Sequence, residues 1–121
     1  MTTEDQWNRV PDQKERRDKL LNGETVLINR NKDKLLLAWA TKNKLTTYIG
    51  RGNNCIWGNP FSIGNDGNRS IVCDKHSEYL DNSPHLLDKI QTLNGRGLVC
   101  FCYPKRCHGN NLINKILPNA G

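Results

Sequence analysis

The residues best suited to chemistry lie near the C-terminus, where Cys100, Cys102, Cys107 and His108 occur within nine positions. A thiolate sulfur is a nucleophile and a soft metal ligand, and an imidazole gains or loses a proton near neutral pH. The apolar run 97–102 predicts a buried central strand, and a helix is expected to begin after the loop that follows it. Reactive side chains would then stand at the end of a strand and the start of a helix.

Cys107, His108 and Gly109 fall at this expected helix start. Free N–H groups and the helix dipole there favour an anion, and the neighbouring Lys105 and Arg106 add positive charge. The dipole also lowers the pKa of a thiol, which makes Cys107 a candidate nucleophile. Ligands of open parallel sheets bind beyond the carboxyl ends of the strands. The segment therefore predicts one wall of a ligand-binding or catalytic pocket.

Two other interpretations of the same residues stay open. The pattern Cys-x-Cys-x4-Cys-His offers up to four donors to zinc. Against zinc, Cys100 and Cys102 would point the same way from a strand, and the chain lacks the Cys-x2-Cys knuckles of structural sites. The third interpretation is structural, with Cys100 as a small core residue and His108 as a helix cap. We predict no cofactor and keep zinc as an alternative.

A second candidate region is the long connection 51–68, which is rich in Gly and Asn. It contains Trp57-Gly58-Asn59-Pro60-Phe61, which combines aromatic rings, a free backbone and an amide. Such a segment can stack a base and form hydrogen bonds with its edge. The alternative is a loop that Trp57 and Phe61 pin to the core, and the residues alone slightly favour it.

The elements that must position these residues follow from the apolar pattern. A βαβ unit with a parallel strand pair is predicted within residues 25–49, and the strand 97–102 comes later. Taken together, the pattern predicts a small three-layer α/β sandwich with a short, mainly parallel, Rossmann-like sheet. Residues 1–22 are predicted to form a charged helical extension, and residues 23–121 a single α/β domain. Helices are expected over residues 12–21, 32–42, 70–80, 83–93 and 109–117.

The bulk composition limits the partners. The 121 residues carry 18 Lys and Arg against 12 Asp and Glu, a net charge of +6. This charge favours an anionic partner such as a nucleotide, a nucleic acid or phosphate, and the alternative is a solvated basic surface without such a partner. No stretch approaches the length needed to span a bilayer, and the N-terminus lacks a signal-peptide core. The five cysteines are an odd number. We therefore expect a cytoplasmic protein with reduced thiols and no membrane partner.

Two separate motifs carry a family resemblance. The first joins Tyr48-Ile49-Gly50-Arg51 to Trp57-Gly58-Asn59-Pro60-Phe61, and the second runs from Leu93 to Pro104 and continues with Cys107-His108-Gly109. With these motifs, residues 23–117 resemble the domain of unknown function family 4326. The sequence departs from the family pattern at Phe101, where Trp is usual.

Members of that family occur in phages and bacteria, sometimes joined to or near DNA-modifying or partitioning domains. The resemblance therefore implies a role in nucleotide or nucleic-acid metabolism, in the host cytoplasm for a phage-encoded protein. It also implies that the residues of the two motifs converge in one pocket, namely Arg51, Trp57, Asn59, Cys102, Cys107 and His108.

The combined prediction is a domain that binds a nucleotide or nucleoside-like small molecule. Arg51 and the helix start at His108 and Gly109 would hold the anionic part, and Trp57 or Phe61 would lie against the base. Gly58, Asn59 and Arg106 complete the predicted ligand-binding set.

Whether the domain is an enzyme stays open. In an enzyme, Cys102 or Cys107 would be the nucleophile, His108 the acid or base, and Asn59 would orient the substrate for cleavage of an N-glycosidic or phosphoester bond. The rival predictions are a non-catalytic phage protein that sequesters a nucleotide signal or inhibits a host protein, and a DNA- or RNA-binding accessory domain.

Overall fold

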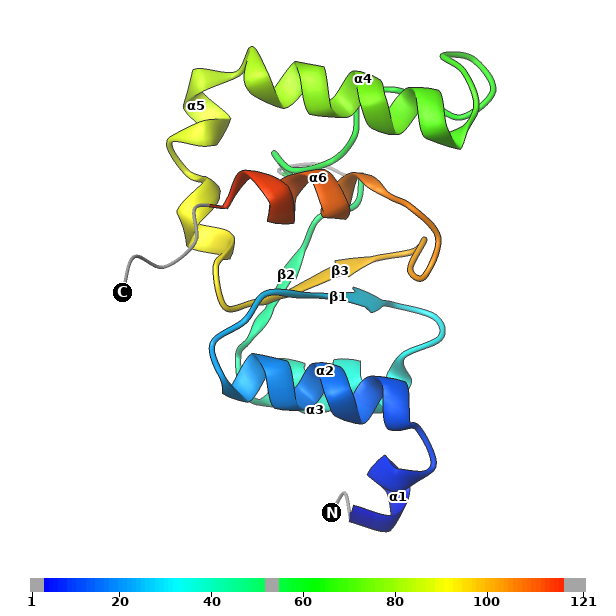
Figure 1. Ribbon diagram of the computed structural model, residues 1–121, viewed down its shortest axis with the longest axis vertical. Helices are drawn as coiled ribbons and strands as arrows, with labels where there is room; N and C mark the ends of the chain where they lie inside the picture. The colour runs from blue at the N-terminus through cyan, green and yellow to red at the C-terminus, as the bar shows by residue number, and fades with distance from the viewer. Residues whose placement is uncertain (1–3, 52–54, 117–121) are drawn as a thin grey trace.

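A computed structural model describes residues 4–51 and 55–116. The chain forms a small α/β fold in which helices cover both sides of a sheet of three strands (Figure 1). None of the helices in the described ranges is long and apolar enough to cross a membrane. The mixed α/β architecture with a short parallel sheet, predicted from the apolar pattern, is confirmed.

The sheet consists of β1 (Val26–Asn29), β2 (Thr46–Tyr48) and β3 (Gly97–Cys100) in the order β1-β3-β2. Both outer strands run parallel to β3. The helix α3 (Lys34–Lys42) joins β1 to β2, as the βαβ pattern predicts, but the two strands are not neighbours. The most apolar strand lies between them, because only a central strand loses water on both faces and both edges.

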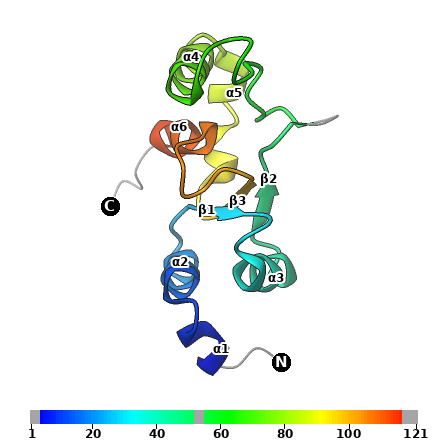
Figure 2. The ribbon, with the colours of Figure 1, turned by 90° about the vertical axis from the view of Figure 1, so that its right-hand side faces the viewer.

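Side chains of the strands alternate between two cores. Val26, Ile28 and Val99 face one core, and Leu27 and Leu98 face the other. This alternation is the two-residue period of a strand. Figure 2 shows the two sides, with α2 (Pro11–Leu21) and α3 on one face of the sheet and α6 (His108–Lys115) on the other.

The N-terminal helices α1 (Glu4–Asn8) and α2 contribute to the first core. Trp7 is 3% exposed and Leu20 is 4% exposed, and both belong to the cluster around Ile28. The guanidinium of Arg16 in α2 also lies 4.2 Å from the ring of Tyr103, a residue of the loop after β3. The N-terminal helices therefore contact both the sheet and the cysteine-containing loop.

The second face carries two tiers of helix, since α6 lies between the sheet and α4 (Arg69–Asp81) (Figure 1). The helix predicted over residues 83–93 is divided into α5 (Pro84–Leu87) and the 3-10 helix η1 (Ile90–Leu93). The predicted end of the last helix at Leu117 lies outside the described residues. The connection 55–68 runs between β2 and α4 without a helix or strand.

Candidate functional site

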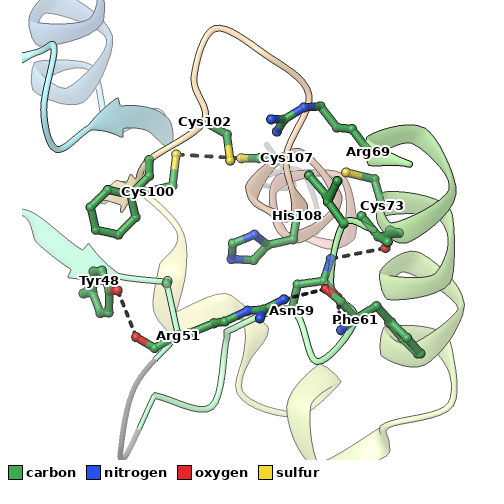
Figure 3. A pocket seen from close by; sticks show the side chains of 14 residues that line it. Tyr48, Arg51, Asn59, Phe61, Arg69, Cys73, Cys100, Cys102, Cys107 and His108 are labelled. Carbon is green, nitrogen blue, oxygen red and sulfur yellow. Dashed lines mark hydrogen bonds between the residues drawn. The ribbon is translucent and has the colours of Figure 1, made fainter. Parts of the chain in front are cut away.

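A pocket of about 320 Å³ opens at the carboxyl ends of β2 and β3, the position at which parallel sheets bind ligands. Its walls come from segments that are far apart in the sequence, namely the ends of two strands, the connection after β2, the first turns of α4 and the start of α6 (Figure 3). The lining residues are Tyr48, Gly50, Arg51, Asn59, Phe61, Ile63, Arg69, Val72, Cys73, Cys100, Phe101, Cys102, Cys107 and His108.

Six of the predicted site residues line this pocket together. They are Arg51, Asn59 and Phe61 from the first motif, and Cys102, Cys107 and His108 from the second. The two motifs meet because the connection that follows β2 and the segment that follows β3 leave adjacent parallel strands at the same edge of the sheet.

Two thiols lie in contact at the wall formed by β3 and α6. The Sγ atoms of Cys100 and Cys107 are 3.7 Å apart, with Cys107 as the donor, and the two residues are 1% and 2% exposed. This bond, together with backbone N–H groups of Cys102 and Tyr103, lowers the pKa of Cys100 to about 6 against the opposing effect of burial. Donation to Cys100 and burial raise the pKa of Cys107, opposite to the direction that the helix start alone predicts.

His108 is held in one tautomer. Its Nε2 lies within hydrogen-bond distance of the carbonyl oxygen of Ile49, so Nε2 carries the proton and Nδ1 is an acceptor. Burial lowers the pKa of His108, and the charge of Arg51 adds to this effect. The imidazole is therefore neutral at pH 7 and is suited to accept a proton.

The pocket has two arginines on its wall. Arg51 donates to the carbonyl oxygen of Phe61 at 2.6 Å and to Oγ of Ser62 at 3.0 Å, and Arg69 donates to the carbonyl oxygen of Arg106 at 3.2 Å. Within the described ranges neither guanidinium forms an ion pair with a carboxylate. Among these described residues, no carboxylate therefore neutralises their positive charge.

Exposed aromatic rings form another part of the wall. Tyr48 and Phe101 meet edge to face with ring centroids 6.2 Å apart, although they are 38% and 48% exposed. Phe61 packs on Tyr79 in the same manner at 6.5 Å. Flat apolar surfaces that remain accessible next to cationic groups are suited to stack a planar ring.

The structure does not bring four of the predicted ligand-binding residues to the pocket wall. Trp57 is 7% exposed and belongs to the core between the sheet and α4, so it pins the loop, as the alternative interpretation states. Gly58 lies against the backbone of Gly50, where a Cβ would come 3.0 Å from the carbonyl oxygen. The other two, Gly109 and Arg106, have different structural roles.

Gly109 allows α6 to approach the sheet, because a Cβ there would lie 2.5 Å from Cδ2 of Leu27 and 2.9 Å from Cδ1 of Ile49. The guanidinium of Arg106 is 2.7 Å from the carboxylate of Asp74 and also contacts Ser70, so the protein already pairs its charge.

Asn59 lines the pocket, but both ends of its amide are engaged with the backbone. Its Nδ2 donates to the carbonyl oxygen of Val72 at 3.2 Å, and its Oδ1 accepts from the backbone N–H of Phe61 at 2.9 Å. The amide therefore holds the connection after β2 against α4, which differs from the predicted role of orienting a substrate.

Sequence reasoning missed several residues that build the site. Cys73, Arg69 and Tyr48 line the pocket, and Asn29 holds the cysteine-containing loop in place. Asn29 Nδ2 donates to the carbonyl oxygens of Phe101 and Tyr103 at 3.3 and 2.7 Å. The sequence signal that could have identified Asn29 is its position as a polar residue at the end of an apolar strand.

The zinc interpretation requires at least three donors around one point. Across residues 4–51 and 55–116, no group of three or more His, Cys, Asp or Glu side chains is arranged to hold a metal ion.

Comparison with known proteins establishes the family. The chain matches the family described as Domain of unknown function (DUF4326) over residues 15–117, and it belongs to this family. It is also similar to Uncharacterized protein R718 of Acanthamoeba polyphaga mimivirus, with 32% identity over 104 residues that cover 73% of this chain and 75% of the relative. No solved structure matches the chain.

Proposed function

We propose that the pocket binds a nucleotide or nucleoside-like small molecule. The observation that carries this proposal is one cavity at the ends of parallel strands that is lined by accessible aromatic rings and by two arginines. Neither arginine has a carboxylate partner in the described part of the chain. Its volume of about 320 Å³ is at the lower end of the range for small-molecule sites.

The two arginines support an anionic group on the ligand. A guanidinium forms two parallel hydrogen bonds with a phosphate. These charge-assisted bonds are stronger than the hydrogen bonds that it forms with a neutral acceptor. The bonds that Arg51 now makes are to a backbone carbonyl and a hydroxyl, and a phosphate is a stronger acceptor than either. The net charge of +6 adds a long-range attraction for anions.

The rings of Phe101, Tyr48 and Phe61 support a base on the ligand, in place of the predicted Trp57. Phe101 occupies the position between Cys100 and Cys102 and is 48% exposed. A base that stacks on the face of an exposed aromatic ring stabilises the complex by about 1–3 kcal/mol. The base would therefore lie over the exposed ring pair, and the phosphate would lie toward the arginines.

The chemistry available at the site is proton transfer and nucleophilic attack. His108 is neutral and presents Nδ1 as an acceptor, and Cys102 is a partly exposed thiol on the same wall. An enzyme built on this site would use His108 as the base for cleavage of an N-glycosidic or phosphoester bond. A protein that only sequesters its ligand would leave these bonds intact.

Calorimetric titration with adenosine, AMP, ADP and inorganic phosphate tests binding. Arg51→Gln should weaken AMP and ADP binding at least about tenfold and change adenosine binding less, because the lost hydrogen bonds go to phosphate. The matched control Arg9→Gln removes the same charge from exposed Arg9 near α1 and should leave the affinity unchanged. Absence of binding for every nucleoside and nucleotide at millimolar concentration would refute the proposal.

Mass analysis of the ligand after incubation with the protein distinguishes an enzyme from a non-catalytic binder. Release of a free base or of phosphate identifies an enzyme, whereas intact ligand identifies a binder that sequesters it. Binding of oligonucleotides with affinity that falls steeply with salt, in the absence of mononucleotide binding, would instead support the accessory nucleic-acid-binding domain.

A further inference from the structure

A second property of the site lies in its pair of buried sulfur atoms. Cys100 ends β3 and Cys107 precedes α6, so two separate elements bring the Sγ atoms to 3.7 Å. A disulfide requires about 2.05 Å, so the sulfurs must approach by about 1.7 Å. The intervening segment 101–107 contains no helix or strand, and a small backbone shift there breaks no regular structure.

The two sulfurs differ in protonation. Cys100 accepts hydrogen bonds from the Cys107 thiol and from two backbone N–H groups, and these donors stabilise a thiolate. Because these donors lower the pKa of Cys100, its thiolate is favoured over that of an ordinary thiol, which is ionised by only a few per cent at pH 7. Cys107 keeps its proton because it is the donor and because it is buried. A thiolate and a thiol in contact are the attacking and resolving groups of thiol oxidation.

We propose that Cys100 and Cys107 form an oxidation site, in which a hydroperoxide oxidises Cys100 and Cys107 then closes a reversible disulfide. The Cys100 thiolate attacks one oxygen of hydrogen peroxide, the O–O bond breaks, and a sulfenic acid and a hydroxide ion form. The hydroxide takes the proton of the Cys107 thiol and becomes water. The Cys107 thiolate attacks the Cys100 sulfur, and the displaced hydroxide takes up the proton that Cys100 had released. The two thiols and one peroxide give one disulfide and two waters.

The pocket explains the choice of oxidant. Both residues line it, while their exposed fractions of 1% and 2% leave almost no surface for a protein partner to reach. Hydrogen peroxide is small enough to enter a cavity of about 320 Å³ and to reach the two cysteines that line it. Because the reaction uses only the two sulfurs, it does not rest on the proposed nucleotide ligand.

The test is oxidation of the full chain with equimolar hydrogen peroxide at pH 7, followed by non-reducing peptide mapping. We expect a loss of two hydrogens and a cross-link between the peptides that contain Cys100 and Cys107, reversed by dithiothreitol. Fragmentation distinguishes Cys100 from Cys102, which lies on the same tryptic peptide. Cys102→Ser and Cys55→Ser are the matched controls, and both should retain the cross-link.

Two further measurements keep the proposal falsifiable if a variant folds poorly. In Cys107→Ser, the sulfenic acid of Cys100 should persist and be trapped by dimedone. In the wild-type chain, oxidation of Cys100 should be at least about tenfold faster than that of Cys55, and urea should remove this difference because it depends on the folded donors. A cross-link to Cys102, equal rates for the two cysteines, or no cross-link at all would overturn the proposal.

Discussion

The two faces of the sheet bury polar side chains in different ways. On the face covered by α2 and α3, the guanidinium of Arg16 lies 2.7 Å from the Asp33 carboxylate and also donates to the carbonyl oxygen of Leu27. The same carboxylate accepts from the backbone N–H of Asn29 at 2.7 Å. On the face covered by α6, His76 is 1% exposed, and its Nε2 has no partner among the described residues.

The completeness of hydrogen bonding distinguishes the structural network on the first face from the candidate site on the second. A buried ion pair with complete hydrogen bonding orders its surroundings and offers nothing to a ligand. A buried donor without an acceptor costs free energy, and natural proteins retain such groups mainly where function requires them. His76 contacts His108 with ring centroids 5.2 Å apart, so its ring packs against a residue that lines the pocket.

The largest loss of stability is expected on the face covered by α2 and α3. Asp33→Ala leaves the guanidinium of Arg16 buried with only the exposed carboxylate of Asp12, and should lower the free energy of unfolding by about 3 kcal/mol. Urea denaturation measures this loss. Glu15→Gln, which removes an exposed ion pair with Lys19, is the control and should cost less than about 1 kcal/mol. A loss below 1 kcal/mol for Asp33→Ala would mean that the network is not structural.

The next largest effect is a loss of stability at acid pH, which we expect from His76 on the opposite face of the sheet. Burial, and then the neighbouring His108, lower the pKa of His76 from 6.5 to about 4. Between these values the unfolded chain binds a proton that the folded chain does not, so stability present above pH 6.5 falls as the pH is lowered to 4, by up to about 3 kcal/mol.

The slope of unfolding free energy against pH tests this assignment. His76→Phe removes the titrating group and should flatten the slope between pH 6.5 and 4, where His108 still contributes. His85→Gln changes an exposed histidine and should keep the wild-type slope. An unchanged slope in His76→Phe would show that another group causes the acid sensitivity.

A smaller loss of stability is expected from Gly109→Ala. The added methyl group would overlap with Leu27 and Ile49, and overpacking of this kind costs about 1–3 kcal/mol. Asn114→Ala, at an exposed position of the same helix, is the control and should not destabilise the protein. If Gly109 serves packing, folded Gly109→Ala should bind nucleotide with the wild-type affinity, and a loss of affinity without a loss of stability would restore its predicted role as a ligand contact.

The smallest effect on stability is expected at the mouth of the pocket. Phe101→Ala removes a half-exposed ring and one edge-to-face contact with Tyr48, which should cost less than about 1 kcal/mol. The same change should weaken nucleoside binding at least about fivefold, because the stacking surface is lost. Thermal denaturation and titration calorimetry measure the two effects, and equal adenosine affinity in Phe101→Ala would place the base elsewhere.

Local patterns predicted the helices and strands well. The continuous apolar runs in Val26–Asn29 and Gly97–Cys100 identify β1 and β3, and the strong helix formers in Lys34–Lys42 identify α3. These patterns arise from neighbours within a few residues along the chain, and the sequence displays them directly. The long predicted helix over 83–93 was wrong as one element, because Asp88 and Lys89 separate α5 from η1.

The site could be predicted as a meeting of two motifs but not in its details. Trp57 and Phe101 are both aromatic residues in motif segments, and only their exposure of 7% and 48% distinguishes a core residue from an accessible surface. In the same way, Arg51 and Arg106 have the same charge, but only Arg106 faces a carboxylate, at 2.7 Å. Such differences depend on neighbours from distant segments, which no local pattern records.

The sequence by itself therefore determined the parallel α/β architecture and the concentration of reactive groups between Cys100 and His108, because periodicity and composition are local properties. Tertiary structure alone decided that β3 lies between β1 and β2, which brings Arg51 and His108 to one cavity. It also decided that Cys100 accepts a hydrogen bond from the Cys107 thiol rather than serving only as a core residue. The physical reason is that strand order and burial arise from contacts between segments tens of residues apart, and these contacts set the pKa, the charge balance and the accessibility of each group.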